Sequence, residues 1–327
     1  DLVILSKIRY PSSISCLRKI LPIVYVWNIF QKKLGKHRKS REVFPAPVRI
    51  KLPPLSYLVA PTKNRRCARQ LISIVQPKLF VAENVKGLTN LANAKKIIEE
   101  DFKTACDNGY LVVSARVLNA ADYGVPQSRE RVIFLGFKKS ALKEEALLAL
   151  SQENVPLDFD PYPPITHAYH HHYSNLMPVV TTQEAFMNLD EPDISNDPDQ
   201  KVYSKAKFMG NHCQGQNEVR LDSVGPTIRS EHHGNIEFRR LSREHGGKHV
   251  YELDRGLGER RLSVRECARI QTFPDDYKFI LDSQNEYGGV SGSQAYRLIG
   301  NAVPPYLAYN LAKRLEENWP LYFKEEK

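Results

Sequence analysis

The sequence of 327 residues predicts an α/β fold, in which part of a doubly wound sheet is joined to a second, smaller domain of loops and short strands. Three observations indicate this. Short apolar runs at 78–82, 111–118 and 131–137 have strand composition, and a stretch of helical periodicity at 90–108 separates the first two. Residues 156–200, which follow, are rich in Pro, His, Asn and Asp and show no long period.

Residues 1–60 differ in composition from the rest of the chain. Their twelve Lys and Arg residues exceed two acidic residues by ten, which equals the formal net charge of +10. One glycine, Gly35, is present, so the segment offers no Gly-rich nucleotide turn. We interpret 1–60 as an unmatched basic segment without a strand or helix period, and we expect it to pack poorly.

The first predicted strand, 78–82, ends at the polar residues Glu83 and Asn84. Open α/β sheets place their functional sites at the carboxyl ends of strands, so these side chains are candidates. The helix predicted over 90–108 is closed by Gly109, which favours a helical crossover over a parallel sheet.

The strands predicted at 111–118 and 131–137 are joined by a charged, turn-rich loop. We assign 61–150 to the first domain and 151–255 to the second. Residues 256–327 are expected to return to the first domain. Their helical periodicity lies at 263–272 and 306–317.

Cysteine spacing and hydropathy exclude some classes of protein. The five cysteines show no CxxC spacing, which favours a reducing cytoplasm over a disulfide scaffold or a zinc site. The apolar stretch 20–30 is too short to cross a bilayer, so no membrane association is expected. His167 and the run 170–172 have no spaced cysteine or carboxylate partners, and we interpret them as an exposed loop and not as a metal site.

Four segments, in this order, resemble the DNA (cytosine-5) methyltransferases. They are 77–88 (PKLFVAENVKGL), 118–131 (LNAADYGVPQSRER), 261–275 (RLSVRECARIQTFPD) and 296–305 (YRLIGNAVPP). The resemblance implies a Rossmann-like methyltransferase sheet, with a target-recognition domain in the variable region between the second and third segments. It also implies a cytoplasmic, prokaryotic enzyme of a restriction-modification system.

The family's chemistry explains why these residue types are needed. Carbon 5 of cytosine is a poor nucleophile, so the family adds a cysteine thiolate to carbon 6 and then takes a methyl group from S-adenosylmethionine. The resemblance implies that Glu83 holds or donates a proton at N3 and that Arg131 stabilises charge at O2 of a flipped base. It further implies that Arg129 assists this catalytic group and that Gln127 contacts DNA.

The resemblance also implies binding residues near the methyl donor and near double-stranded DNA. Asn301 and Ala302 are expected to approach S-adenosylmethionine. Residues 225–234 (GPTIRSEHHG) resemble the start of the DNA-reading loops, which makes Thr227, Arg229 and His232 candidates for groove contacts.

Two parts of the family pattern have no counterpart. The chain contains no Pro-Cys dipeptide, so the Pro-Cys-Gln nucleophile loop is missing, and 44–49 (FPAPVR) stands near its expected place. The glycine-rich loop that binds S-adenosylmethionine is also missing. Cys16 and Cys67 lack the flanking residues of the nucleophile loop. We therefore expect weak S-adenosylmethionine binding and no methylation by this chain alone.

Three explanations remain open for the missing loops. In the first, the chain is truncated or residues 1–60 are translated in a disrupted frame, since with an AGR codon for Arg49 the codons for 46–49 (APVR) can encode Pro-Cys-Gln in a neighbouring frame. Alternatively, the chain is the DNA-binding subunit of a split methyltransferase and a complementing chain brings both loops. The third is a catalytically dead DNA-binding relative. Glu83 and Arg131 argue for descent from an active enzyme, because a purely regulatory DNA-binding module needs neither.

Overall fold

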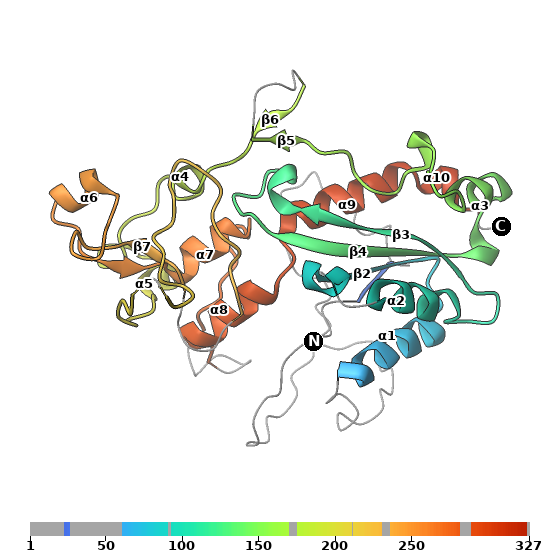
Figure 1. Ribbon diagram of the computed structural model, residues 1–327, viewed down its shortest axis with the longest axis horizontal. Coiled ribbons are helices and arrows are strands. Elements are labelled where there is room, and N and C mark those ends of the chain that lie inside the picture. The colour runs from blue at the N-terminus through green and yellow to red at the C-terminus, as the bar shows by residue number, and fades with distance from the viewer. Residues whose placement is uncertain are drawn as a thin grey trace. The chain divides into compact units, whose positions relative to one another are not determined.

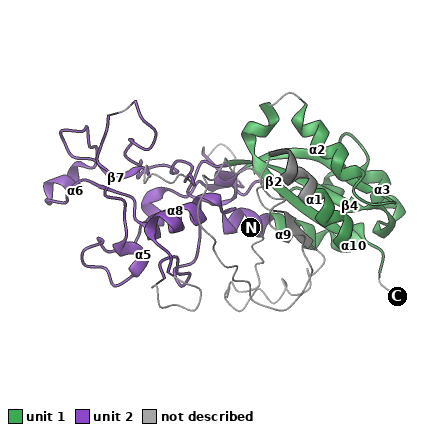
Figure 2. Cartoon of the chain, turned by 90° about the horizontal axis from the view of Figure 1, so that it is seen from below, with its two compact units in different colours: residues 1–118, 130–163, 311–327 green, residues 119–129, 164–310 purple. Residues whose placement is uncertain are grey.

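The computed structural model contains two compact units, which are described separately (Figures 1 and 2). Unit 1 comprises residues 1–118, 130–163 and 311–327, and unit 2 comprises 119–129 and 164–310. The residues that the structure describes are 23–26, 61–90, 93–169, 175–210, 212–230, 236–281 and 289–325.

Unit 1 is built on a four-stranded sheet with the order β1-β2-β4-β3. The strands are β1 (Ile23–Val26), β2 (Leu79–Val85), β3 (Tyr110–Asn119, whose last residue falls in unit 2) and β4 (Glu130–Lys138). β1 runs parallel to β2, whereas β2 and β4 are antiparallel. The expected strands are confirmed, but the expectation of a parallel sheet is wrong for β4. The ten residues between β3 and β4 are too few for a helical crossover, so the chain turns back.

β1 lies in the segment that was expected to contribute no strand. Its residues pair with β2 in parallel register, Ile23 opposite Leu79. The expectation is therefore wrong for Ile23–Val26. The sequence IVYV is β-branched or aromatic throughout, and a run of four residues is too short to show a period. The rest of 1–60 lies outside the described residues.

Two helices, α1 (Pro61–Val75) and α2 (Ala94–Lys103), cover one face of the sheet (Figure 1). α2 is shorter than the predicted 90–108, and Gly109 follows it with a left-handed φ of 65°. Phe80 stands on this face between Phe102 and Tyr110, with ring centroids 4.9 and 5.1 Å away. Gly136 lies opposite Phe80 in the sheet, and any side chain there would overlap the Phe80 ring.

Aromatic residues from the C-terminal end of the chain pack on the other face. The ring of Phe137 in β4 lies 5.2 Å from Tyr322 and 6.2 Å from Phe323. Tyr322 belongs to α10 (Trp319–Tyr322), which contacts α3 (Glu144–Leu150). Three short 3-10 helices complete unit 1, namely η3 (Lys86–Asn90), η5 (Lys139–Ala141) and η6 (Leu157–Phe159).

Unit 2 consists of loops, short strands and mostly short helices, as expected for the second domain. It is larger than the proposed 151–255 segment, because 119–129 and the stretch to 310 cluster with it. Its core gathers around α7 and α8, whose N-termini are fixed by capping boxes at Ser263 and Ser291. The elements are η4 (Ala120–Tyr123), β5 (His167–Ala168), β6 (Met177–Pro178), α4 (Thr182–Ala185), α5 (Pro198–Lys201), β7 (Phe238–Arg240), α6 (Val250–Asp254), β8 (Arg260–Arg261), α7 (Val264–Ile270), α8 (Gly292–Asn301) and α9 (Pro305–Glu317, which enters unit 1 at residue 311).

The two helices predicted near the C-terminus are confirmed as α7 and α9. Among the described residues, no helix has the length and apolar character needed to cross a membrane.

Candidate functional site

A buried ion pair lies at one end of the sheet in unit 1. Glu83 is near the end of β2 and faces Ile133 across the strand pair, and Val85 faces Arg131. Because residues two apart in a strand point to the same face, Arg131 lies diagonally across from Glu83 on that face. Arg131 Nε is 2.7 Å from Glu83 Oε1, and the side chains are 9% and 7% exposed. The expectation that these residues converge, 48 positions apart, is confirmed.

The environment of this pair sets its electrostatics. Burial lowers the pKa of Arg131, while the charge and hydrogen bonding of Glu83 act in the opposite direction. Arg131 Nη1 also donates to the Glu130 carbonyl at 2.8 Å, which fixes the guanidinium plane. A carboxylate and a guanidinium are therefore held close together, largely away from water, where their hydrogen bonds to a planar polar ligand are strengthened.

In unit 2, Gln127 and Gln271 form a fully buried amide pair. Gln127 Nε2 donates to Gln271 Oε1 at 3.0 Å, and its Oε1 accepts from the Ile228 backbone N–H at 3.1 Å. Gln271 Nε2 in turn donates to the Ile299 carbonyl at 2.6 Å. Both side chains are 0% exposed. This pair joins the loop before β4, the end of α7, the segment around Ile228 and the end of α8.

Arg129 reinforces the same junction with a forked set of hydrogen bonds. Its guanidinium donates to the carbonyl groups of Ile228 at 3.0 Å, Gly300 at 2.8 Å and Ala302 at 3.0 Å. The residue is 1% exposed. Gly300 permits this junction, because a Cβ there would overlap the backbone of Arg229.

These contacts bear on two sequence-based assignments, in which Arg129 and Gln127 brace the loop and the phosphates. Gln127 was expected to contact DNA, but its amide is enclosed and hydrogen-bonded within unit 2. Arg129 was expected in the catalytic group, but its guanidinium donates to three carbonyl groups of unit 2. A charged pattern such as Gln-x-Arg-x-Arg does not reveal which way its side chains point. Both residues position backbone segments and do not present a surface to a ligand.

Gln271 is the member of this junction that the sequence did not reveal. It follows the last residue of α7, and segment 261–275 was interpreted only as part of the resemblance. A glutamine directly after a buried, apolar helix face is the signal that could have identified it, because a buried amide must find hydrogen-bond partners.

The predicted DNA-reading loop is partly exposed. Ile228 is 0% exposed, whereas Thr227 and Arg229 on either side of it are partly exposed, as in an extended segment with alternating faces. Thr227 Oγ1 donates to the Ser128 carbonyl at 2.6 Å, and Arg229 Nη2 lies 3.0 Å from Glu237 Oε1. His232 lies outside the described residues.

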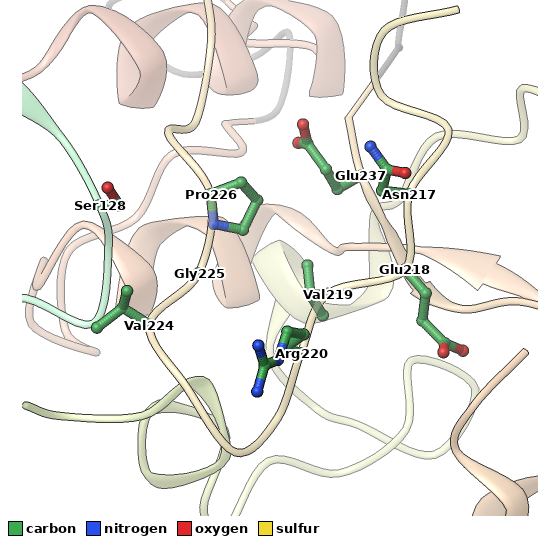
Figure 3. A pocket seen from close by; sticks show the side chains of 9 residues that line it. All are labelled: Ser128, Asn217, Glu218, Val219, Arg220, Val224, Gly225, Pro226 and Glu237. Atoms are coloured by element: carbon green, nitrogen blue, oxygen red, sulfur yellow. The ribbon is translucent and has the colours of Figure 1, made fainter. Parts of the chain in front are cut away.

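A cavity of about 280 Å³ lies beside this loop (Figure 3). Its lining combines apolar and polar residues, with the side chains of Asn217 and Glu237 near each other at one end. The lining residues are Ser128, Asn217, Glu218, Val219, Arg220, Val224, Gly225, Pro226 and Glu237. The loop therefore has two partly exposed polar side chains beside a hollow.

Asn301 and Ala302, expected near the methyl donor, occupy the end of α8 in unit 2. Asn301 is the last residue of α8 and is partly exposed. The Ala302 carbonyl accepts from Arg129 and Gln271, and its N–H donates to the Ile299 carbonyl at 3.0 Å. Ala302 is buried, so Asn301 is the residue of the two that can offer a polar group to a ligand.

Comparison with known proteins gives consistent matches. A family model described as C-5 cytosine-specific DNA methylase matches residues 67–317. The chain is 35% identical to type II methyltransferase M.BspRI of Lysinibacillus sphaericus over 271 residues, 80% of this chain and 55% of that protein. It is 33% identical to type II methyltransferase M.BsuRI of Bacillus subtilis over 267 residues, 79% of this chain and 53% of that protein. The chain thus spans about half the length of these two relatives.

Proposed function

The chain belongs to the C-5 cytosine-specific DNA methylases, and from this premise we propose that it carries the base-binding pair and DNA-reading loops of a restriction-modification DNA (cytosine-5) methyltransferase. The reaction is methyl transfer from S-adenosylmethionine to carbon 5 of cytosine in a specific sequence of double-stranded DNA. The buried Glu83–Arg131 pair, which lies inside the matched region, is the observation that carries the proposal.

In this proposal, Glu83 and Arg131 bind two edges of one flipped cytosine. The Glu83 carboxyl group holds a proton at N3, and the Arg131 guanidinium stabilises negative charge at O2. Both interactions make carbon 6 more electrophilic. The base must come between the two side chains, whose atoms are 2.7 Å apart without it, and its ring then replaces their direct contact. The low exposure of the pair supports this function, since water would weaken both interactions.

Asn301 and Ala302 fit one wall of a site for S-adenosylmethionine, which supplies the methyl group when bound. Asn301 is partly exposed and carries an amide, whereas Ala302 beside it is largely buried. Arg129 and Gln271 hold the Ala302 carbonyl and thereby fix the position of this wall. Because these residues form only one wall of the site, we expect S-adenosylmethionine to bind weakly to this chain.

The nucleophile must come from residues that this sequence does not provide. Family chemistry uses the cysteine of a Pro-Cys-Gln loop, and no Pro-Cys dipeptide occurs here. Among the cysteines that the structure describes, Cys267 is fully buried, and desolvation raises the pKa of its thiol, which disfavours the thiolate. We therefore propose that methylation requires a further segment or a complementing chain that carries both missing loops. The absence of the dipeptide equally favours a second candidate, DNA binding without catalysis.

A methyl-transfer assay separates these functions. Transfer of tritiated methyl groups from S-adenosylmethionine to mixed-sequence DNA is measured with the chain alone and with an added chain that supplies the glycine-rich and Pro-Cys-Gln loops. We expect no incorporation by the chain alone and incorporation by the mixture. Incorporation by the chain alone would mean that the nucleophile has been misidentified. DNA binding without incorporation in either case would support the second candidate.

A further inference from the structure

A second ion pair lies at the same end of the β2–β4 strand pair as Glu83 and Arg131. Lys86 begins η3 directly after β2, and Glu130 is the first residue of β4. Lys86 Nζ is 2.6 Å from Glu130 Oε1. Lys86 follows Val85 and Glu130 precedes Arg131, so this second pair lies one position further toward that end of the strand pair.

The two pairs differ in their exposure to solvent. The side chains of Lys86 and Glu130 are 49% and 43% exposed, against 9% and 7% for the buried pair. The backbone beside Lys86 is also accessible, since a Cβ on Gly87 would meet nothing within 4 Å. Half-exposed ion pairs contribute little to folding stability, so Lys86 can exchange its partner at low cost.

We propose that Lys86 binds a phosphate of the DNA strand that carries the target cytosine, and that Glu130 holds the Lys86 ammonium in place until DNA arrives. The proposal rests on the proposed function, because a base bound by Glu83 and Arg131 brings its own phosphates to the rim of the site. Lys86 directly follows β2, the strand that carries Glu83, and it has a charge of the required sign. In the free protein Glu130 neutralises that charge.

The proposal predicts opposite effects for the two members of the pair. Replacing Lys86 removes a phosphate contact and also exposes the Glu130 carboxylate to the DNA, so binding weakens for two reasons. Replacing Glu130 releases Lys86 and removes a negative charge from the rim, so binding tightens. A purely structural surface pair would give both replacements the same small effect on folding and none on DNA affinity.

DNA binding by the full chain at several salt concentrations tests the proposal. Fluorescence anisotropy of a labelled, mixed-sequence duplex is measured between about 50 and 200 mM KCl for the wild type, Lys86→Gln, Glu130→Gln and the double variant. Lys103→Gln is the matched control, because Lys103 is 47% exposed and paired with Glu100 on α2 of the same unit. Circular dichroism melts verify that every variant is folded.

We expect Lys86→Gln to weaken binding about tenfold and to reduce the slope of log affinity against log salt by about one. Glu130→Gln should tighten binding about threefold, and the double variant should lie between the two single variants. Equal affinities and slopes for the wild type, Lys86→Gln and Glu130→Gln would overturn the inference while leaving the proposed function intact. Failure of the wild type to bind DNA would overturn both.

Discussion

Arg129 shows how one side chain can fix a site without touching a ligand. Its guanidinium donates hydrogen bonds to the carbonyl groups of Ile228, Gly300 and Ala302. The same side chain therefore holds both the predicted DNA-reading loop and the end of α8. A guanidinium can do this because its donors lie in one plane in a fixed geometry. An ammonium of equal charge cannot reach three acceptors placed in this way.

Arg129→Lys should therefore have a lower free energy of unfolding than the wild type. We expect a loss of about 3 kcal/mol, because buried carbonyl groups lose their donors, and we expect Arg129→Gln to lose a similar amount. Urea unfolding measures the change. Arg116→Lys is the control, since Arg116 is 45% exposed and its Nη1 bonds to a single carboxylate, that of Asp160. Full stability of Arg129→Lys would show that charge alone matters at this position.

The Glu83–Arg131 pair gives a second prediction at this scale. Glu83→Gln should lower the free energy of unfolding by about 2–3 kcal/mol, because Arg131 would remain buried without its counter-charge. Replacing Glu100, which is exposed and paired with Lys103, should change it by less than about 0.5 kcal/mol. Similar effects of the two changes in urea unfolding would contradict the burial argument.

At the residue scale, the chemical role of a side chain was easier to predict than its orientation. Glu83 and Arg131 were expected to converge because the family resemblance assigns them to two edges of one flipped base, and their ion pair confirms the convergence. The burial of Gln127 was not predicted, because a polar residue in a turn-rich loop is usually exposed, whereas here it faces the buried amide of Gln271. That partner is 144 positions away, and sequence pattern does not report such contacts.

At the scale of elements, strand existence followed from local composition, while strand direction did not. The apolar runs that became β2, β3 and β4 were found, but β4 is antiparallel to β2. Direction depends on how the connection between β3 and β4 turns, and its ten residues, which are too few for a helical crossover, were not used to assign it. The four residues of β1 were missed because they sit in a basic segment without periodicity.

The packing of Phe80 over Gly136 yields a prediction about the sheet. Gly136→Ala should cost about 2–3 kcal/mol, because the added methyl group overlaps the Phe80 ring on the face that α1 and α2 cover. Phe80→Leu in the same chain should recover part of that loss, so that the two changes are not additive. Gly87→Ala should be near neutral, since its Cβ meets open space. Thermal unfolding of Gly136→Ala, Phe80→Leu, the double variant and Gly87→Ala tests this. Additive losses in the first three would place the strain elsewhere.

Charged residues inside unit 2 couple its stability to pH. Glu191 accepts hydrogen bonds from Arg260 at 2.8 Å and from Arg240 at 3.3 Å. Burial acts to raise the pKa of Glu191, but these hydrogen bonds and charges outweigh it and lower the pKa to about 2. Arg240 also bonds to Glu252, whose pKa is likewise lowered.

A lowered carboxyl pKa means that stability is present above the unfolded-state pKa of about 4.3 and is lost as pH falls toward the folded-state value. We therefore expect the free energy of unfolding to fall between about pH 4.5 and pH 2. Glu191→Gln should be less stable than the wild type at pH 7, and its stability should depend less on pH over that window. Urea unfolding followed by circular dichroism measures both, and parallel pH profiles would contradict the assignment.

The central claim for the whole molecule is that Glu83 and Arg131 bind the cytosine that is methylated. A chimera tests it, in which an N-terminal segment with the glycine-rich and Pro-Cys-Gln loops replaces the residues before 67, where the family match begins. Single-turnover transfer of tritiated methyl groups to DNA is measured for the chimera and its Glu83→Gln form, after both are shown to bind DNA. We predict transfer by the chimera and a rate about 10²- to 10³-fold lower for Glu83→Gln. Equal rates for the two would contradict the claim.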